Sequence, residues 1–142
     1  MAVCKHILIA TDLTTENNSV VKKAMEIVKV FGAKVGLVHI IEPLPGYGYA
    51  YVGVADIEGE LLQDAAKAMH KLAKKYDIDE KHCYVEVGPT KSEIMSIAQK
   101  EKADCIILGS HGRHGFAELL GSTAHAIVHG ANCDVITVRI KD

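Results

Sequence analysis

The chain has 142 residues, of which 49% are hydrophobic and 24% are charged, and its formal net charge is −2. A chain of this length can bury one sizeable core, which predicts a single domain over residues 1–142. The 16 Lys and Arg residues are scattered along the sequence and form no basic segment. The charge pattern therefore excludes nucleic acid as a main partner.

The amino-terminal sequence MAVCKHILIATDL contains an apolar run that is too short for a signal peptide or a membrane span. We therefore expect a cytoplasmic protein without a membrane partner. Cys4, Cys83, Cys105 and Cys133 show no CxxC spacing, and most of them lie in apolar runs. This distribution indicates buried free thiols.

The first two strands and the helix between them follow from the apolar pattern. Near-continuous Ile, Val and Leu predicts strands that are covered on both faces, and the first two are HILIA (6–10) and KVGLVHII (34–41). Between them, apolar residues share one side of a helix from Asn17 to Phe31, and Gly32 provides a left-handed stop. We expect this helix to cross between two parallel strands.

A long connection follows the second strand. Residues 42–60 (EPLPGYGYAYVGVADIEGE) concentrate proline, glycine and tyrosine, which predicts a mobile loop. Such a loop would act as a lid or a partner surface, or it would be a long connection whose tyrosines pack on the domain. A helix is predicted from about Asp56 to Tyr76. Its apolar face consists of Ile57, Leu61, Leu62, Ala65, Met69, Leu72 and Ala73.

The second half of the chain repeats the alternation of strand and helix. Three more strands are predicted at HCYVEV (82–87), DCIILG (104–109) and DVITVRI (134–140). A helix opens with Thr90-x-x-Glu93, which has the spacing of a capping box. A last helix begins near Ser122 or Thr123 and ends at Gly130.

Strands that alternate with helices predict an α/β fold with right-handed crossovers and a parallel sheet covered by helices on both faces. We expect an open five-stranded sheet in the order 3-2-1-4-5. Ligands of such sheets bind at the carboxyl ends of the strands, where the strand order reverses. The loops after the first and fourth strands should therefore carry the site.

The loop from Gly109 to Thr123 follows the fourth strand and carries several groups that suit a phosphate. Glycines allow backbone amides to approach phosphate oxygens, and a helix amino terminus adds unpaired N–H groups. The candidates are Gly109, His111, Gly112, Arg113, Gly121, Ser122 and Thr123. The structural alternative is that the glycines only turn the chain and Ser122 is an ordinary N-cap.

Asp12 follows the first strand and should stand at the same crevice. A carboxylate at this place can accept both hydroxyls of a ribose, as acidic residues do in other doubly wound nucleotide sites. Alternatively, Asp12 caps the first helix or the turn that leads into it.

Taken together, Asp12 after the first strand, Gly109-x-x-Gly112, Gly121-Ser122 before the last helix and the closing Val-Ile-Thr-Val strand resemble the universal stress protein family. The likeness spans essentially the whole chain. It implies ATP, alone or with Mg²⁺, as the ligand, although some members of that family do not bind ATP. It also implies a homodimer in which the last strand pairs with the same strand of a second copy.

The resemblance implies a role for each matching residue. Asp12 and Gly109 would lie at the ribose, Ala10, Ile40 and Leu108 at the adenine, and Gly112, Gly121, Ser122 and Thr123 at the phosphates. The family pattern has nine residues between its second glycine and the Gly-Ser/Thr pair, whereas eight separate Gly112 from Gly121 here. The shorter loop either narrows the phosphate site or is absorbed within the loop.

Other chemistry finds less support. His111 and His114 are close, and His125 and His129 are one helical turn apart, but no acidic or cysteine ligand has a matching local spacing, so we expect no metal site. No P-loop, G-x-G-x-x-G after the first strand or G-x-S-x-G elbow occurs. His111-Gly112-Arg113-His114 is similar to the His-x-Gly-His of nucleotidylyltransferases, but its glycine is displaced and it follows the fourth strand.

The sequence therefore predicts a cytoplasmic stress-response homodimer that binds an adenine nucleotide and is not an enzyme, apart from slow ATP hydrolysis at most. The alternative is a homodimer of the same fold that binds no nucleotide and acts through protein–protein interactions.

Overall fold

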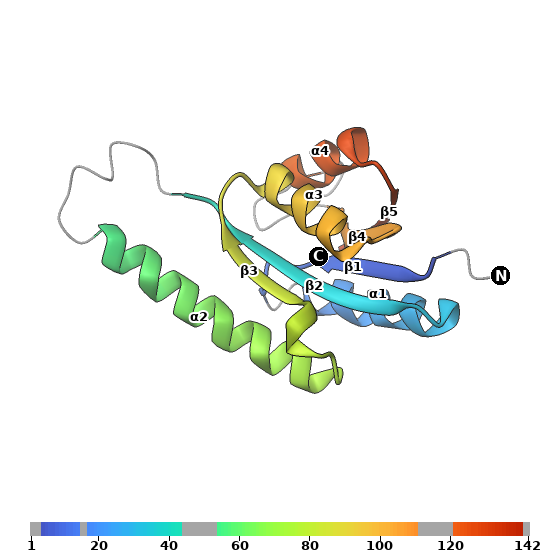
Figure 1. The fold of residues 1–142 in the computed structure, drawn as a ribbon, viewed down its shortest axis with the longest axis horizontal. Coiled ribbons are helices and arrows are strands. Elements are labelled where there is room, and N and C mark those ends of the chain that lie inside the picture. Colours follow the sequence, from blue (N-terminus) through green and yellow to red (C-terminus); the bar gives the residue numbers. More distant parts are fainter. Residues whose placement is uncertain (1–3, 15–16, 44–53, 111–120, 141–142) are drawn as a thin grey trace.

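The computed structural model describes residues 4–14, 17–43, 54–110 and 121–140, and it contains one parallel sheet in the order β3-β2-β1-β4-β5 (Figure 1). The predicted fold class and strand order are confirmed. The strands are β1 (His6–Ala10), β2 (Lys34–Ile41), β3 (Cys83–Val87), β4 (Cys105–Gly109) and β5 (Asp134–Val138).

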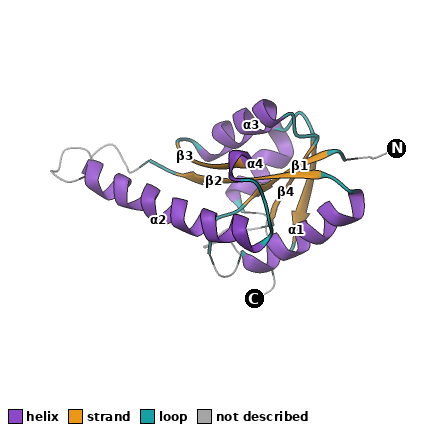
Figure 2. Ribbon diagram, turned by 60° about the horizontal axis from the view of Figure 1, so that its bottom comes forward, coloured by secondary structure: helices purple, strands orange, loops and turns teal. Residues whose placement is uncertain are grey.

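Two pairs of helices cover the two faces of the sheet, with α1 and α2 on one face and α3 and α4 on the other (Figures 1 and 2). A short 3₁₀ helix, Glu80–His82, precedes β3. The helices are α1 (Asn18–Phe31), α2 (Val54–Lys75), α3 (Thr90–Glu101) and α4 (Ser122–Gly130).

Alternate residues of the central strands enter two separate cores because successive side chains of a strand point to opposite faces. In β1, Ile7 and Ile9 pack under α1 and α2, whereas Leu8 and Ala10 pack under α3 and α4. All four side chains are buried. Burial on both faces explains why these strands show near-continuous apolar sequence.

The helix signals were correct at α1 and wrong at α3. Gly32 ends α1 in the left-handed region, with φ of 63°, as predicted. At α3 the N-cap position belongs to Pro89, so Thr90 is already helical and no side chain caps the helix. The Thr90 hydroxyl instead donates to Glu42 Oε1 at 2.9 Å. The predicted capping box does not form because Pro89, with ψ of 123°, takes the extended N-cap conformation itself.

Helix α2 begins at Val54, within the segment predicted as a loop, so residues 54–60 are helical and residues 44–53 lie outside the described part of the chain. The amino-terminal half of α2 extends past the sheet (Figure 1). Ile57 and Leu61, which we expected in the core, are therefore 49% and 41% exposed. Among the described residues no helix is long and apolar enough to cross a bilayer.

The ends of the sheet differ slightly from expectation. His82 belongs to the 3₁₀ helix rather than to β3, and β5 ends at Val138 although apolar sequence continues to Ile140. Hydrogen bonds to the neighbouring strand define a strand end, and apolar sequence does not report them. As predicted, β5 lies at an edge of the sheet.

The four cysteines are free thiols, of which Cys4 and Cys105 are buried and Cys83 and Cys133 are only half-buried. Burial raises the pKa of Cys105 to about 12, with a further contribution from Cys4. Burial, followed by the nearby carboxylates of Glu80 and Asp79, raises the pKa of Cys83 to about 11. These two thiols are therefore protonated at neutral pH and are poor nucleophiles.

Candidate functional site

The carboxyl ends of β1 and β4 lie side by side, as the strand order requires. The two strands pair in parallel, with Ile9 opposite Ile107. Ala10 and Leu108 follow these residues, and both are buried on the face covered by α3 and α4. Ile40 of β2 belongs to the same core. The structure thus brings together the three apolar residues predicted at the adenine.

Asp12 lies directly after β1 and is half-buried. Its Oδ1 accepts hydrogen bonds from the backbone N–H of Thr14 at 2.9 Å and from the Thr14 hydroxyl at 2.6 Å. Asp12 therefore holds the turn that leads into α1, which was one of the structural alternatives, while Asn17 takes the N-cap position. Within the described part of the chain, the hydrogen bonds to this carboxylate reach Oδ1.

The backbone after Asp12 is strained. Leu13 has φ of 62°, in the left-handed region that non-glycine residues rarely occupy. Its N–H donates to the Thr11 hydroxyl at 3.0 Å, which helps to hold this conformation. Strain of this kind costs of order 1–3 kcal/mol and clusters at functional sites. The turn that carries Asp12 is therefore fixed at a cost in stability.

A polar network that the sequence pattern does not predict supports this turn. The Thr11 hydroxyl donates to Asn17 Oδ1 at 2.6 Å, and both side chains are buried. His39, in β2, donates from Nδ1 to the carbonyl oxygen of Thr11 at 2.8 Å. Polar residues next to predicted strand ends were the available signal. Their partners become visible only when β1 and β2 are placed side by side.

Gly109 ends β4 in a crowded position. A Cβ atom there would lie 2.9 Å from Ile140 Cδ1 and 3.2 Å from Val20 Cγ2. The chain then continues into Ser110, whose N–H donates to the carbonyl oxygen of Val138 in β5 at 2.8 Å. Glycine at residue 109 therefore serves close packing at the point where the chain leaves the sheet.

Gly121 stands at the amino terminus of α4, immediately beside the end of β4. Its N–H donates to the carbonyl oxygen of Ser110 at 2.7 Å, so the ends of the intervening segment are fixed to each other. Gly121 is the N-cap residue and no side chain caps the helix. The first-turn amides at Ser122 and Thr123 lack intrahelical partners by geometry, which suits an anion. The predicted residues His111, Gly112 and Arg113 lie outside the described residues.

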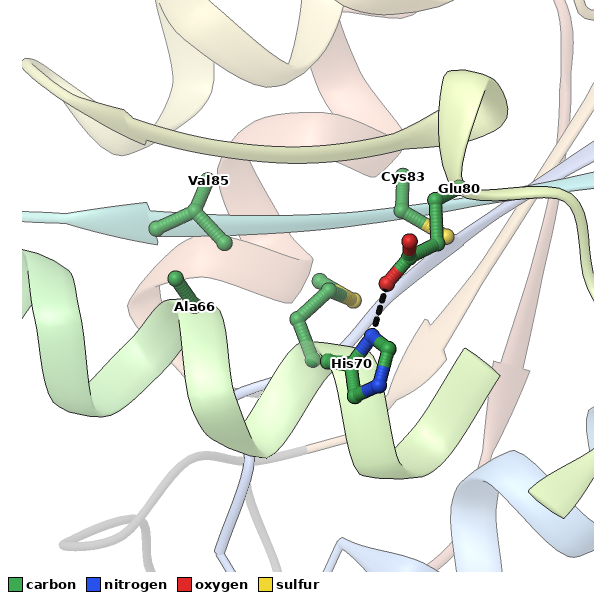
Figure 3. Close-up of a pocket in the computed structure, with 6 residues that line it drawn as sticks. Ala66, His70, Glu80, Cys83 and Val85 are labelled. Carbon is green, nitrogen blue, oxygen red and sulfur yellow. Dashed lines mark hydrogen bonds and ion pairs between the residues drawn. The ribbon is translucent and has the colours of Figure 1, made fainter. Parts of the chain in front are cut away.

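A separate pocket lies between α2 and β3, away from this edge (Figure 3). His70 Nδ1 and Glu80 Oε1 form a hydrogen bond across it. Its remaining lining is mainly apolar, and the Cys83 thiol at its margin is held protonated by the raised pKa. We find no assembled nucleophile or base in this pocket.

His125 and His129 lie on the exposed side of α4. Their ring centroids are 4.4 Å apart, at an interplanar angle of 49°. Among the described residues, neither belongs to a group of three possible metal ligands. His114 lies outside the described residues.

The family model of the universal stress protein family matches residues 4–139. The chain belongs to this family. Universal stress protein A homolog 2 of Coxiella burnetii is 45% identical over 141 residues, which are 96% of each chain. The expected family and the α/β architecture are thus confirmed along almost the whole length.

Solved structures of the family share this fold. The hypothetical protein MJ0577 superimposes with a TM-score of 0.79 at 26% identity, covering 97% of both chains. A universal stress protein solved in complex with cAMP superimposes with a TM-score of 0.61 at 22% identity, covering 97% of this chain and 98% of its own. The architecture described above is therefore that of universal stress proteins.

Proposed function

We propose that this universal stress protein binds an adenine nucleotide, with ATP as its ligand, at the carboxyl ends of β1 and β4. It would act in the cytoplasm as a single nucleotide-binding domain that responds to stress through its bound state. The observation that carries the proposal is the meeting of Asp12, Gly109 and the amino terminus of α4 at the point where the strand order reverses.

The ribose end has the firmest geometric support. Asp12 is held by the Thr14 hydrogen bonds and keeps Oδ2 for the ribose hydroxyls. Ala10, Ile40 and Leu108 would contact adenine from the apolar side of the site. A universal stress protein with 22% identity was solved in complex with cAMP, which is also an adenine nucleotide. This relative supports the nucleotide class of the ligand.

The phosphate end would use backbone donors. Gly121 leaves the first-turn amides of α4 uncovered, no acidic residue stands in that turn, and the helix dipole favours an anion there. The hydroxyls of Ser122 and Thr123 would add donors, and His111, Gly112 and Arg113 would complete the site. The Ser110–Gly121 hydrogen bond supports this arrangement, since it fixes both ends of the shortened loop.

The direct test is calorimetric titration of the purified protein with ATP and Mg²⁺, compared with ADP, AMP and cAMP, together with mass spectrometry for copurified nucleotide. We expect saturable heat and a preference for one of these ligands. Absence of both copurified nucleotide and titratable heat would contradict the proposal.

The ATP affinity of a Gly121→Val variant tests where the phosphates bind. Gly121 has φ of −63° and ψ of 160°, which valine can adopt, so the variant should fold while its side chain obstructs the amides. We expect at least tenfold weaker ATP binding. The matched control is Gly59→Val in α2, where an added Cβ meets nothing within 4 Å. Unchanged affinity in a folded Gly121→Val protein would show that the phosphates lie elsewhere.

No catalytic machinery accompanies this proposal. Because we find no nucleophile or general base assembled among the described residues at the carboxyl edge, we expect at most slow ATP hydrolysis. Turnover with release of adenylate or pyrophosphate that depends on His111 or His114 would instead favour a nucleotidyl-transfer enzyme.

The exposed apolar residues Ile57 and Leu61 favour a second candidate, a stress-response homodimer that acts through protein partners. The dimer itself would form through β5, whose outer edge is unpaired in the described sheet. The Val138 carbonyl faces β4, so the backbone groups of the preceding residue, Thr137, face outward. Thr137→Pro should therefore yield a monomer by light scattering and Thr137→Val a dimer. A dimer in both variants would place the interface elsewhere.

A further inference from the structure

Two imidazoles and one carboxylate converge at the amino end of the sheet, opposite the edge that carries Asp12. His6 begins β1, His82 ends the 3₁₀ helix before β3, and Glu101 ends α3. One possible ligand atom of each residue lies within 4.8 Å of those of the other two. The fold thus assembles a His/His/Glu group from three distant segments.

The separations within this group suit a small divalent ion. His82 Nδ1 lies 2.9 Å from Glu101 Oε1, and His6 Nε2 lies 3.5 Å from the same oxygen. Ligand atoms bound to Zn²⁺ at about 2.0–2.1 Å in a tetrahedron are about 3.4 Å apart. The two imidazole rings meet nearly at right angles, with centroids 5.9 Å apart. The two nitrogen–oxygen separations lie on either side of the tetrahedral value, and the two nitrogens lie within 4.8 Å of each other.

The negative charge of Glu101 and the burial of His6 Nε2 favour a bound cation in this group. The Glu101 side chain is only 9% exposed, and it lies at the carboxyl end of α3, where the helix dipole disfavours a negative charge. His6 Nε2 is buried and has no hydrogen-bond partner among the described residues. A buried polar atom without a partner is costly. A divalent ion would neutralise the carboxylate and give His6 Nε2 a partner.

The surrounding backbone makes room for these side chains and fixes them. A Cβ atom on Gly36 of β2 would lie 2.9 Å from Glu101 Oε1 and 3.0 Å from the carbonyl oxygen of His82. The carboxylate of Asp104 accepts from the backbone N–H of Lys5 at 2.9 Å and of His6 at 3.2 Å. The start of β1 is thereby held in place, as a preformed metal site requires.

We propose that His6, His82 and Glu101 form a Zn²⁺ site in which His6 binds through Nε2, His82 through Nδ1 and Glu101 through a carboxylate oxygen. Water completes the tetrahedron on the open side, where the His82 side chain is 32% exposed. Two imidazole ligands favour Zn²⁺ over Mg²⁺ and Ca²⁺, which prefer oxygen. The site lies roughly 20 Å from Asp12 along β1 at 3.3 Å per residue, so it is separate from the proposed nucleotide site.

The bound ion would link β1, the segment before β3 and the end of α3. Because an ion that binds only the folded chain stabilises it, Zn²⁺ should raise the melting temperature in a concentration-dependent way. This stabilisation does not depend on nucleotide.

The test is calorimetric titration of chelator-treated, nucleotide-free protein with ZnCl₂, followed by visible absorption of the Co²⁺ form. We expect one ion per chain at this site and absorption typical of tetrahedral Co²⁺. Glu101→Gln and His82→Asn should each weaken Zn²⁺ binding by at least about tenfold and abolish the Zn²⁺-dependent rise in melting temperature. His82 is only partly buried, with its side chain 32% exposed, so we expect the His82→Asn protein to fold.

Gly36→Ala tests the same site with all three ligands intact. Its Cβ would displace the Glu101 carboxylate, so we expect weaker Zn²⁺ binding. The control variants are His70→Ala, which breaks an exposed His–Glu pair, and the double change His125→Ala and His129→Ala on α4. Both controls should retain the high-affinity ion.

Three outcomes would overturn the proposal. These are no Zn²⁺ uptake by the wild-type protein, unchanged uptake in folded Glu101→Gln and His82→Asn proteins, and loss of the ion in the α4 double variant instead. ATP affinity should be equal in wild-type and Glu101→Gln proteins, so failure of the zinc site and failure of the nucleotide site are distinguishable.

Discussion

The carboxyl and amino ends of the sheet carry different chemical groups. At the carboxyl end, the candidate site consists of glycines, backbone amides and one carboxylate held in a strained turn. At the amino end, two histidines from distant segments meet one carboxylate whose side chain is only 9% exposed. All four cysteines also lie before or at the amino ends of strands. Backbone donors suit a large anion, whereas converging side chains suit a small cation.

A substitution in the core between the two ends should have the largest effect on the free energy of unfolding. Ile107 is fully buried in β4, so Ile107→Ala should lower the free energy of unfolding by about 3 kcal/mol, and Ile107→Val by about 1 kcal/mol. Urea denaturation measures both values. Nucleotide and Zn²⁺ affinities of the folded variants should stay equal to wild type. A change in either affinity would mean that the core couples the two ends.

Asp12→Asn removes one negative charge from the carboxyl end of the sheet and leaves the amino end unchanged. An asparagine oxygen can still accept from Thr14, so the turn should persist, but a charge-assisted hydrogen bond to ribose of about 1.5–3 kcal/mol is weakened. We expect ATP binding to weaken by at least tenfold, with Zn²⁺ binding unchanged, both by calorimetry. Asp64→Asn on the exposed face of α2 is the control. Equal ATP affinity in both variants would remove Asp12 from the site.

Alkaline pH should lower the free energy of unfolding through the Cys105 thiol, which lies at the amino end of β4. Burial raises the pKa of Cys105 from 9.0 to about 12, so its stabilising effect is fully present below pH 9 and is lost as pH rises towards 12, because the unfolded chain releases the proton first. We expect a lower free energy of unfolding at pH 10.5 than at pH 8. Cys105→Val should reduce this difference, and an undiminished difference would assign it to other groups.

Thr90→Ala has the smallest expected effect. The Thr90 hydroxyl donates to exposed Glu42 and caps no helix, so we expect a loss below about 0.5 kcal/mol rather than the ~1 kcal/mol of an N-cap. Urea denaturation of this variant beside wild type is sufficient. A loss of 1 kcal/mol or more would restore the capping box.

The fold was predictable because the central strands carry their own signal. Near-continuous apolar sequence marked β1 and β2 to the residue, and the alternation of strands and helices implied the strand order. Errors occurred where an outcome depends on neighbours. Ile57 is exposed because α2 extends past the sheet, and no periodicity within the helix reports where the sheet ends.

The two candidate sites also differ in how far a local sequence pattern predicts their residues. Asp12, Gly109 and Gly121 could be named because each stands at a strand or helix end and belongs to a spaced pattern. His6, His82 and Glu101 belong to no local spacing, and they come together only through the order of β1, β2 and β3 and the packing of α3 on these strands. The strain at Leu13 and the His39 contact to Thr11 were invisible for the same reason.

The hydrogen bond between Ser110 and Gly121 has a consequence for how universal stress proteins of this type can diversify. It joins the two residues that flank residues 111–120. The entropic cost of closing a flexible loop grows only with the logarithm of its length, and each doubling adds only about 0.6 kcal/mol. Insertions or deletions between these anchors therefore leave β4 and α4 in place and cost little stability. In the nucleotide site proposed above, such changes would alter the contacts to the ligand while the scaffold keeps its stability.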